Sequence, residues 1–390
     1  MTADMSFVLT EEQKALKAAV RDLCLQYTAE YWRDLDTRRE YPEAFVNELT
    51  KAGYLAVLIP EEYGGGGLGI MEAALILEEI NRSGGNGGAC HAQMYIMGTL
   101  LRHGSEQQKQ RFLPRIASGE LRLQAFGITE PTVGSDTTRI QTRAERVGDG
   151  YVIRGQKIWT SRALHSDLML LLARTTPIED VEKRTEGLSV FIVDMEAAGA
   201  RLDIRPIRTM MNHATTEVFL DDVEVPGDAL VGEAGQGFRY ILDAMNAERI
   251  LIAAECIGDG RWFVDKAARY ASERVVFGRP IGVNQGVQFP IARAHAVIEA
   301  ADLVRYKAAW LFEAGEPCGP EANVAKLLAS EASWQAANAC LDTHGGFGFA
   351  EEYDVERKFR ENRLYQVAPV SNNLILSYLA EHVLGLPRSY

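Results

Sequence analysis

A short segment of the chain carries the residue types that hold a flat, phosphate-bearing cofactor. Within residues 126–136, the hydroxyls of Thr129 and Ser135 can donate hydrogen bonds to an acceptor-rich ligand. Gly134 has no side chain, so its backbone can approach a phosphate closely. Hydroxyl and backbone donors together suit a pyrophosphate or the polar edge of a planar ring.

A second segment, residues 155–161, adds an aromatic side chain to these hydrogen-bond donors. Trp159 can stack on a planar ring, and Thr160 and Ser161 beside it can donate hydrogen bonds to ring nitrogens. Taken alone, Trp159 is more commonly a core side chain. The cofactor interpretation therefore depends on both segments together.

The spacing of apolar residues predicts three regions that position these segments. Residues 10–120 follow helical periodicity, as in Leu16, Ala19, Val20 and Leu23. From about residue 122 to 230, short β-branched and aromatic runs alternate with turn residues, and helical spacing returns from residue 237 onward. We expect a helical domain over 1–121, a β-domain over 122–234 and a second helical domain over 235–390.

Two glycine-rich segments, residues 59–67 and 84–88, resemble phosphate-binding loops at first sight. Neither contains the Lys-Ser/Thr pair that a P-loop requires. We interpret both as turns in which two backbones pass closely.

The charge balance excludes some classes of partner. Lys and Arg total 41 against 54 for Asp and Glu, which gives a net charge of -13. This charge opposes non-specific attraction to nucleic acid or to anionic membranes. The longest apolar runs, such as residues 168–173, are far shorter than the roughly 20 residues that span a bilayer.

The five cysteines are scattered and form no C-x-x-C pair, so the sequence predicts neither a disulfide framework nor a metal site. Residues 1–11 lack the basic start and apolar core of a signal peptide. We expect a reducing, cytoplasmic location.

An ordered set of motifs along the chain resembles the acyl-CoA dehydrogenase family. The two cofactor segments have the family's order and spacing, and further matches extend over nearly the whole chain. These are Tyr63 with two glycines, Gln107 to Lys109 with Pro114 and Glu120, Arg274 to Gly278 with Gln285, and Gly345 to Gly348 followed by Tyr353 and Arg360. The resemblance implies an α+β multidomain fold with a β-barrel-like middle domain and a C-terminal four-helix bundle.

The resemblance also implies FAD as the cofactor and a set of residues that contact it. In the middle domain these are Phe126, Ile128, Thr129, Ser135, Trp159, Thr160 and Ser161, and in the C-terminal domain Arg274, Phe277, Gln285, Asp342, Gly345, Gly346, Ser371 and Asn373. Some family FAD contacts cross a subunit boundary, which implies a homo-oligomer, usually a tetramer. Asp342 departs from the usual Gln, and a carboxylate there would repel a phosphate.

The catalytic base of the family is missing from its commonest position. Acyl-CoA dehydrogenation needs a carboxylate to remove the α-proton. Many members carry that Glu in a Tyr-Glu-Gly-Thr motif, whereas this chain has Ala368-Pro369-Val370-Ser371. Other members carry the Glu on the first long helix of the C-terminal domain, which Glu248 matches. On residue type alone, a Glu-Arg pair on a helix is more often a solvated face or an ion pair.

Three further substrate positions are implied. Ser135, Asn246 and Arg249 match residues that meet the CoA or acyl part in relatives, and Ala368 and Pro369 replace a bulkier pair, which favours a branched or cyclic acyl group. Pro369 has no N–H, so a backbone donor to the thioester oxygen is absent unless Ala368 or Val370 supplies it.

The sequence argues against an acyl tail that ends in a carboxylate. Relatives that act on such substrates place an Arg in the turn that spans residues 85–89 here, and no basic residue lies between Arg82 and His91. His91, Met94 and nearby apolar residues could line the floor of the acyl pocket or belong to the core.

The sequence thus predicts an FAD-dependent acyl-CoA dehydrogenase of fatty or branched acyl-CoA metabolism. An electron-transfer flavoprotein is the expected electron acceptor. Two alternatives stay open: a flavoprotein of this fold with a different reaction, such as a desulfinase or an oxidase of small nitrogen compounds, and a non-catalytic acyl-CoA-binding homologue.

Overall fold

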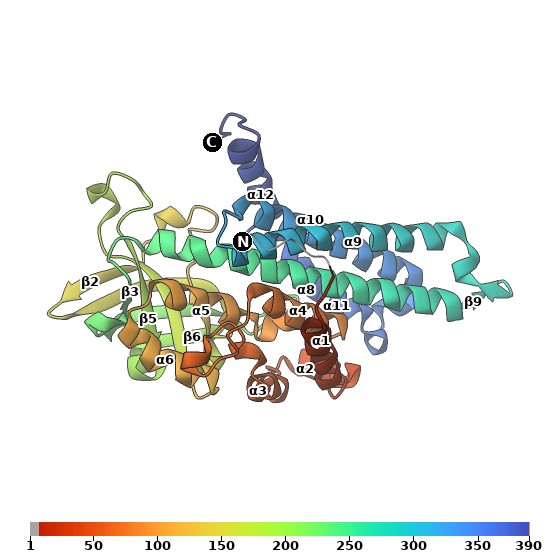
Figure 1. Ribbon diagram of the computed structural model, residues 1–390, viewed down its shortest axis with the longest axis horizontal. Helices are drawn as coiled ribbons and strands as arrows, with labels where there is room; N and C mark the ends of the chain where they lie inside the picture. Colours follow the sequence, from red (N-terminus) through yellow and green to blue (C-terminus); the bar gives the residue numbers. More distant parts are fainter. Residues whose placement is uncertain (1–7, 390) are drawn as a thin grey trace. The chain divides into compact units, whose positions relative to one another are not determined.

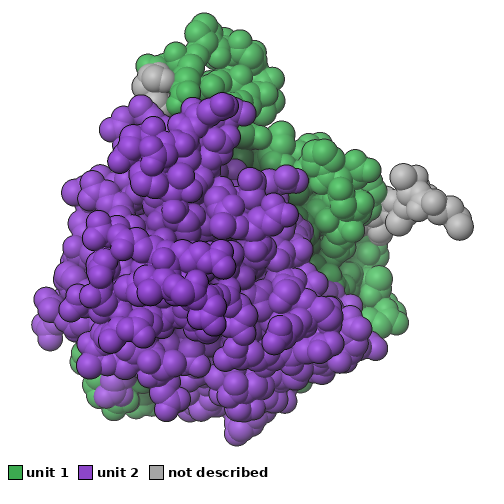
Figure 2. Space-filling view, turned by 90° about the vertical axis from the view of Figure 1, so that its left-hand side faces the viewer, with its two compact units in different colours: residues 1–38, 69–87, 246–390 green, residues 39–68, 88–245 purple. Residues whose placement is uncertain are grey.

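The computed structural model describes residues 8–389, which form two compact units, coloured separately in Figure 2. The first unit comprises the residues up to 38, residues 69–87 and those from 246 onward. The second comprises residues 39–68 and 88–245.

The first unit is a bundle of helices. Its helices are α1 (Glu11–Cys24), α2 (Ala29–Arg38), α4 (Ile70–Arg82), most of α8 (Gly237–Glu273), α9 (Gln285–Glu313), α10 (Gly319–His344), α11 (Val355–Arg363) and α12 (Asn372–Tyr378). The long helices α9 and α10 run side by side (Figure 1). Small buried residues of α10, among them Ala325, Ala329 and Ala336, allow close helix contact while favouring the helix itself.

A buried carboxylate holds four of these helices together. Glu78 on α4 is fully buried, and its oxygens lie 2.7 Å from Lys17 Nζ on α1, 2.6 Å from Arg261 on α8 and 3.1 Å from Arg305 on α9. Burial raises the pKa of Glu78, but Arg305, Lys17 and Arg261 outweigh it and lower the pKa to about 2.

The Glu78→Gln variant should therefore lose stability in a pH-dependent way. Because the folded-state pKa lies below the usual value of 4.5, the carboxylate stabilises the fold above that value and less as the pH falls toward 2. We expect a loss of about 3 kcal/mol at pH 7, from the shift of the pKa. Urea unfolding should show that the difference in unfolding free energy between variant and wild type is smaller at pH 3 than at pH 7. Glu11→Gln, at an exposed ion pair, should leave the free energy of unfolding unchanged at both pH 7 and pH 3.

The second unit is built on a mixed sheet with the strand order β6-β7-β3-β2-β4-β5-β8, and β1 pairs with β4. The strands are β1 (Leu123–Gly127), β2 (Arg143–Val147), β3 (Gly150–Ser161), β4 (Leu168–Arg174), β5 (Leu188–Asp194), β6 (Leu202–Pro206), β7 (Thr215–Val225) and β8 (Leu230–Val231). Helices α3 (Glu43–Lys51), α5 (His91–His103), α6 (Glu106–Ala117) and the short α7 (Met195–Ala198) complete the unit.

The strands follow from the local patterns. Every residue of β4 is buried, as expected for a continuous apolar run in the interior of a sheet. Val147 pairs with Gly150, so Gly148 and Asp149 form the two-residue turn from β2 into β3. Gly148 has the positive φ, 61°, that such a turn requires. The structure thus confirms the predicted order of helical, β and helical regions.

The predicted N-terminal helical region divides between the two units. Helices α1, α2 and α4 belong to the first unit, whereas α3, α5 and α6 belong to the second. In the described residues, no helix is long and apolar enough to cross a membrane.

Candidate functional site

The first cofactor segment leaves strand β1 at Gly127 and is fixed to β3 by a buried lysine. Lys157 is fully buried, and its ammonium lies 3.0 Å from the carbonyl oxygen of Ile128 and 2.9 Å from Oε1 of Glu130. The backbone N–H of Ile158 donates to the carbonyl of Thr129 over 2.9 Å. These contacts hold residues 128–130 alongside the strand that leads to Trp159.

The contacts of Lys157 with Glu130 and with the Ile128 carbonyl are here called the Lys157 clamp. Burial and the attraction between Lys157 and Glu130 set the charges of these two side chains. Burial lowers the pKa of Lys157 to about 8, partly offset by Glu130, so the lysine remains protonated at neutral pH. Burial raises the pKa of Glu130, but the Lys157 ammonium and hydrogen bonds from the Thr142 and Gln141 region bring it below its usual value. The clamp is thus an ion pair.

Trp159 projects from a bulge and is exposed. Ile158 pairs with Glu217 and Thr160 with Thr216, so Trp159 is an extra residue in β3. Its φ is 60°, which is uncommon for a bulky residue, and 56% of its surface is accessible. The core interpretation of Trp159 is therefore wrong. An exposed indole on a strained backbone suits stacking against a bound ring.

The remaining residues of the middle segments fit a cofactor in type and exposure. Oγ1 of Thr160 is buried and has no hydrogen-bond partner among the described residues. Ser161 is half-buried at the end of β3, and Ser135 is exposed next to Gly134, whose neighbourhood is open space. Phe126 is half-buried, with its ring centroid 6.2 Å from that of Tyr95.

Six of the predicted C-terminal contacts lie in two places of the first unit, and Ser371 and Asn373 lie in a third, at α12 (Asn372–Tyr378). Phe277 is fully exposed, with a φ of 53°, at the tip of the small hairpin β9 (Val275–Val276) and β10 (Arg279–Pro280). Arg274 enters this hairpin, and Gln285 is the first residue of α9. An aromatic side chain held wholly in solvent suits a contact outside its own chain.

The second place is the end of α10. Gly345 and Gly346 follow the helix, and no atom would meet a side chain built on either. Arg274 lies over the ring of Phe347, 5.4 Å from its centroid, so the hairpin and this turn adjoin. Asp342 is exposed on the last turn of α10.

The candidate base Glu248 lies on α8 and is 6% exposed. The interpretation of Glu248 as part of a solvated helix face is therefore wrong. Arg249 NH1 donates to Oδ1 of Asn246 over 2.9 Å, and Arg249 Nε is buried without a hydrogen-bond partner among the described residues. Burial lowers the pKa of Arg249, and the neighbouring Glu248 carboxylate opposes that shift.

The loop that replaces the Tyr-Glu-Gly-Thr motif is anchored on both sides. Before it, the Tyr365 hydroxyl donates to Glu255 Oε2 over 3.0 Å. After Pro369, the buried Lys326 donates to the carbonyl of Val370 over 2.8 Å. Ser371 caps α12 through the N–H of Leu374, and Asn373 is exposed on that helix.

The structure brings to the candidate site residues that the motifs did not single out. Lys157 and Glu130 lie within the two motif segments, but only the pairing of these segments brings the two side chains together. Arg162 and His213 gave no local signal, because they meet only through the pairing of β3 with β7.

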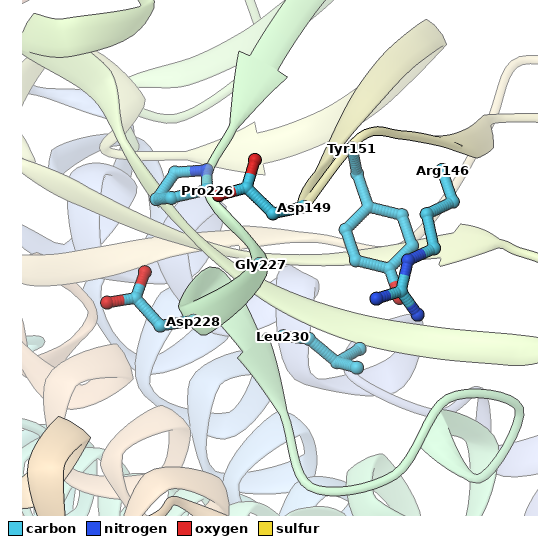
Figure 3. Close-up of a pocket in the computed structure, with 7 residues that line it drawn as sticks. All are labelled: Arg146, Asp149, Tyr151, Pro226, Gly227, Asp228 and Leu230. Atoms are coloured by element: carbon cyan, nitrogen blue, oxygen red, sulfur yellow. The ribbon is translucent and has the colours of Figure 1, made fainter.

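A separate open pocket of about 560 Å³ lies at the β2–β3 turn and the start of β8 (Figure 3). Arg146 and Tyr151 line one side, and Asp149 and Asp228 supply carboxylates. None of the predicted site residues lines this pocket.

Comparisons with known proteins find the same family along nearly the whole chain. Three family models match: acyl-CoA dehydrogenase, N-terminal domain, over residues 10–120; middle domain, over 125–223; and C-terminal domain, over 235–384. Acyl-CoA dehydrogenase FadE12 of Mycobacterium tuberculosis is 36% identical and covers 99% of this chain and 100% of its own. Cyclohex-1-ene-1-carbonyl-CoA dehydrogenase of Syntrophus aciditrophicus is 33% identical and covers 94% and 88%.

Solved structures of dehydrogenases share the fold. Glutaryl-coenzyme A dehydrogenase in complex with glutaryl-CoA superposes with a TM-score of 0.92 at 31% identity, covering 99% of this chain and 98% of that one. Butyryl-CoA dehydrogenase of Megasphaera elsdenii has a TM-score of 0.91 at 28% identity, covering 97% and 100%. FAD, the cofactor expected from the motifs, is confirmed at the level of the family, and the exposed indole and open glycine backbones suit it. The chain is an oxidoreductase that belongs to the acyl-CoA dehydrogenase family.

Proposed function

We propose that the chain catalyses α,β-dehydrogenation of an acyl-CoA thioester to the 2,3-enoyl-CoA. The observation that carries the proposal is the buried carboxylate of Glu248 on α8. A carboxylate removed from water is a stronger base than one in solution, because burial disfavours its charged form. Glu248 takes the α-proton, and the β-hydrogen leaves with its electron pair.

FAD supplies the acceptor for that hydride when it is bound. We propose that the exposed indole of Trp159 flanks the flavin ring, with hydroxyls of Thr160 and Ser161 as donors to it. Phe126, Ile128, Thr129 and Ser135 complete the proposed middle-domain contacts, and Arg274, Phe277, Gln285, Asp342, Gly345, Gly346, Ser371 and Asn373 the C-terminal ones.

The thioester oxygen needs a hydrogen-bond donor, which Pro369 cannot supply. The N–H of Ala368 is already engaged with the carbonyl of Leu364 at 2.9 Å. We therefore propose the N–H of Val370 as the replacement, since Lys326 holds the adjoining carbonyl in place. Asn246 and Arg249 are the proposed contacts to the CoA or acyl part.

The fully exposed Phe277 supports an oligomer in which this hairpin meets a second copy of the chain, for which we propose a tetramer. All five cysteines lie among the described residues, are buried and form no disulfide, which supports a reducing cytoplasmic location. An electron-transfer flavoprotein is the proposed acceptor of the electrons.

Anaerobic addition of acyl-CoAs to the FAD-loaded protein tests the function. At least one straight, branched or cyclic acyl-CoA should bleach the flavin absorbance and yield the 2,3-enoyl-CoA, identified by mass spectrometry. Bleaching by no member of a broad panel would instead point to another reaction on this fold or to a binding protein.

A further inference from the structure

A buried cation without a counter-ion lies directly after the residues proposed to flank the flavin. Arg162 follows Ser161 at the end of β3 and is 4% exposed. Its NH1 donates to the carbonyl of Gly88 and lies 3.4 Å from Nε2 of His213. Neither group is anionic, and Arg162 Nε has no hydrogen-bond partner among residues 8–389.

The groups that contact Arg162 are neutral hydrogen-bond acceptors and carry no negative charge. The His213 ring lies edge-on to the ring of His91, with centroids 6.4 Å apart. His91 is 5% exposed and is the first residue of α5, at the end of the helix where the backbone dipole is positive. Burial, Arg162 and His91 all lower the pKa of His213 well below its usual value, as expected next to uncompensated positive charge.

These side chains are continuous with the middle-domain part of the proposed flavin site. The ring of His91 lies 5.6 Å from that of Tyr95, which lies 6.2 Å from that of Phe126. Arg162 itself is one residue from Ser161. A ligand group that reaches Arg162 is therefore close to the segments that hold the cofactor.

The contact between Arg162 and Gly88 places a basic side chain at the turn over residues 85–89, where the sequence alone shows none. In the sequence, no basic residue lies between Arg82 and His91. Strand β3 brings a guanidinium to that turn from a position 74 residues away in the chain. A buried arginine without a carboxylate partner is costly, and an anion from outside the chain would offset that cost.

We propose that Arg162, His91 and His213 form a subsite for a carboxylate at the far end of the acyl group. The proposal rests on the acyl-CoA dehydrogenase function proposed above and names its substrate class, the ω-carboxyl acyl-CoAs. The planar guanidinium offers the free Nε and a neighbouring N–H as a paired donor to the two carboxylate oxygens. His91 lies at the positive end of the α5 backbone dipole.

Matched substrate pairs test the subsite in the FAD-loaded wild-type protein. Each pair has one chain length, with and without the terminal carboxylate: glutaryl-CoA and pentanoyl-CoA, adipyl-CoA and hexanoyl-CoA, suberyl-CoA and octanoyl-CoA. For at least one pair, kcat/KM should be about 10-fold or more higher for the carboxylated member. Equal or lower values for the carboxylated member of every pair would overturn the proposal.

Variants at Arg162 assign the preference to this residue. In Arg162→Met the ratio of the two kcat/KM values in the preferred pair should fall about 10- to 100-fold, because a charged hydrogen-bonded pair is lost. Arg162→Lys keeps the charge without the paired donors and should give an intermediate ratio; it also serves if the Met variant does not fold. Arg143→Met, at an exposed arginine of β2, should keep the wild-type ratio. An unchanged ratio in Arg162→Lys, or in Arg162→Met where it folds, would contradict the assignment.

A binding measurement separates this inference from the proposed function. Titration of the flavin spectrum or calorimetry reports binding of each acyl-CoA without turnover. Tighter binding of the carboxylated member that is lost in an Arg162 variant, with no flavin bleaching, would support the subsite while refuting dehydrogenation. Bleaching by uncharged acyl-CoAs with no carboxylate preference would support dehydrogenation and refute the subsite.

Discussion

The Glu248→Gln variant should retain FAD but lose flavin bleaching by acyl-CoA, with a rate lower by about 10²- to 10⁴-fold. An amide has nearly the shape of a carboxylate and cannot accept the α-proton at neutral pH. The buried position of Glu248 makes this loss specific, because bulk water has little access to replace it as base. Stopped-flow absorbance under anaerobic conditions, together with the flavin content of the purified protein, measures both properties.

A matched control lies on the same helix. Glu273 is exposed at the end of α8 and pairs with Arg269, so Glu273→Gln should bleach at the wild-type rate. If Glu248→Gln bleached as fast as this control, Glu248 would not be the base. Loss of FAD from Glu248→Gln would instead show that its carboxylate has a structural part in holding the cofactor.

The Lys157→Met variant should lose both stability and FAD affinity. Removing the ammonium leaves Glu130 buried without its cation and releases the carbonyl of Ile128. Breaking one partner of a buried ion pair costs about 3 to 5 kcal/mol. Residues 128–130 and Trp159 then lose their common anchor, so the FAD dissociation constant should rise. Chemical unfolding and flavin fluorescence titration measure the two effects.

A double variant distinguishes the clamp from general damage. In Lys157→Met with Glu130→Gln, no unpaired charge remains, so part of the lost unfolding free energy should return. FAD affinity should stay low, because Ile128 still lacks its donor. Lys183→Met, at an exposed lysine, is the control and should match wild type. Wild-type stability and FAD affinity in Lys157→Met would refute the clamp.

Local sequence patterns predicted the strands and the order of the regions well. The short β-branched and aromatic runs expected from about residue 122 to 230 became strands β1 to β7, and the turn residues Gly148 and Asp149 join β2 to β3. Such signals succeed because apolar periodicity and turn chemistry depend on neighbouring residues. Patterns along the helices did not say which unit each helix joins, because an apolar face fits many partners and only packing selects one.

The cofactor segments show the same division between local and tertiary information. Residue types and spacing by themselves predicted a flat, phosphate-bearing cofactor at residues 126–136 and 155–161. The resemblance of the ordered motifs to the family then named FAD and pointed to Glu248 as the base. Only the tertiary structure placed Trp159 on an exposed bulge and Lys157 against Ile128. It alone brought Arg162 to Gly88, because strand pairing and chain reversal join residues whose separation leaves no periodic trace in the sequence.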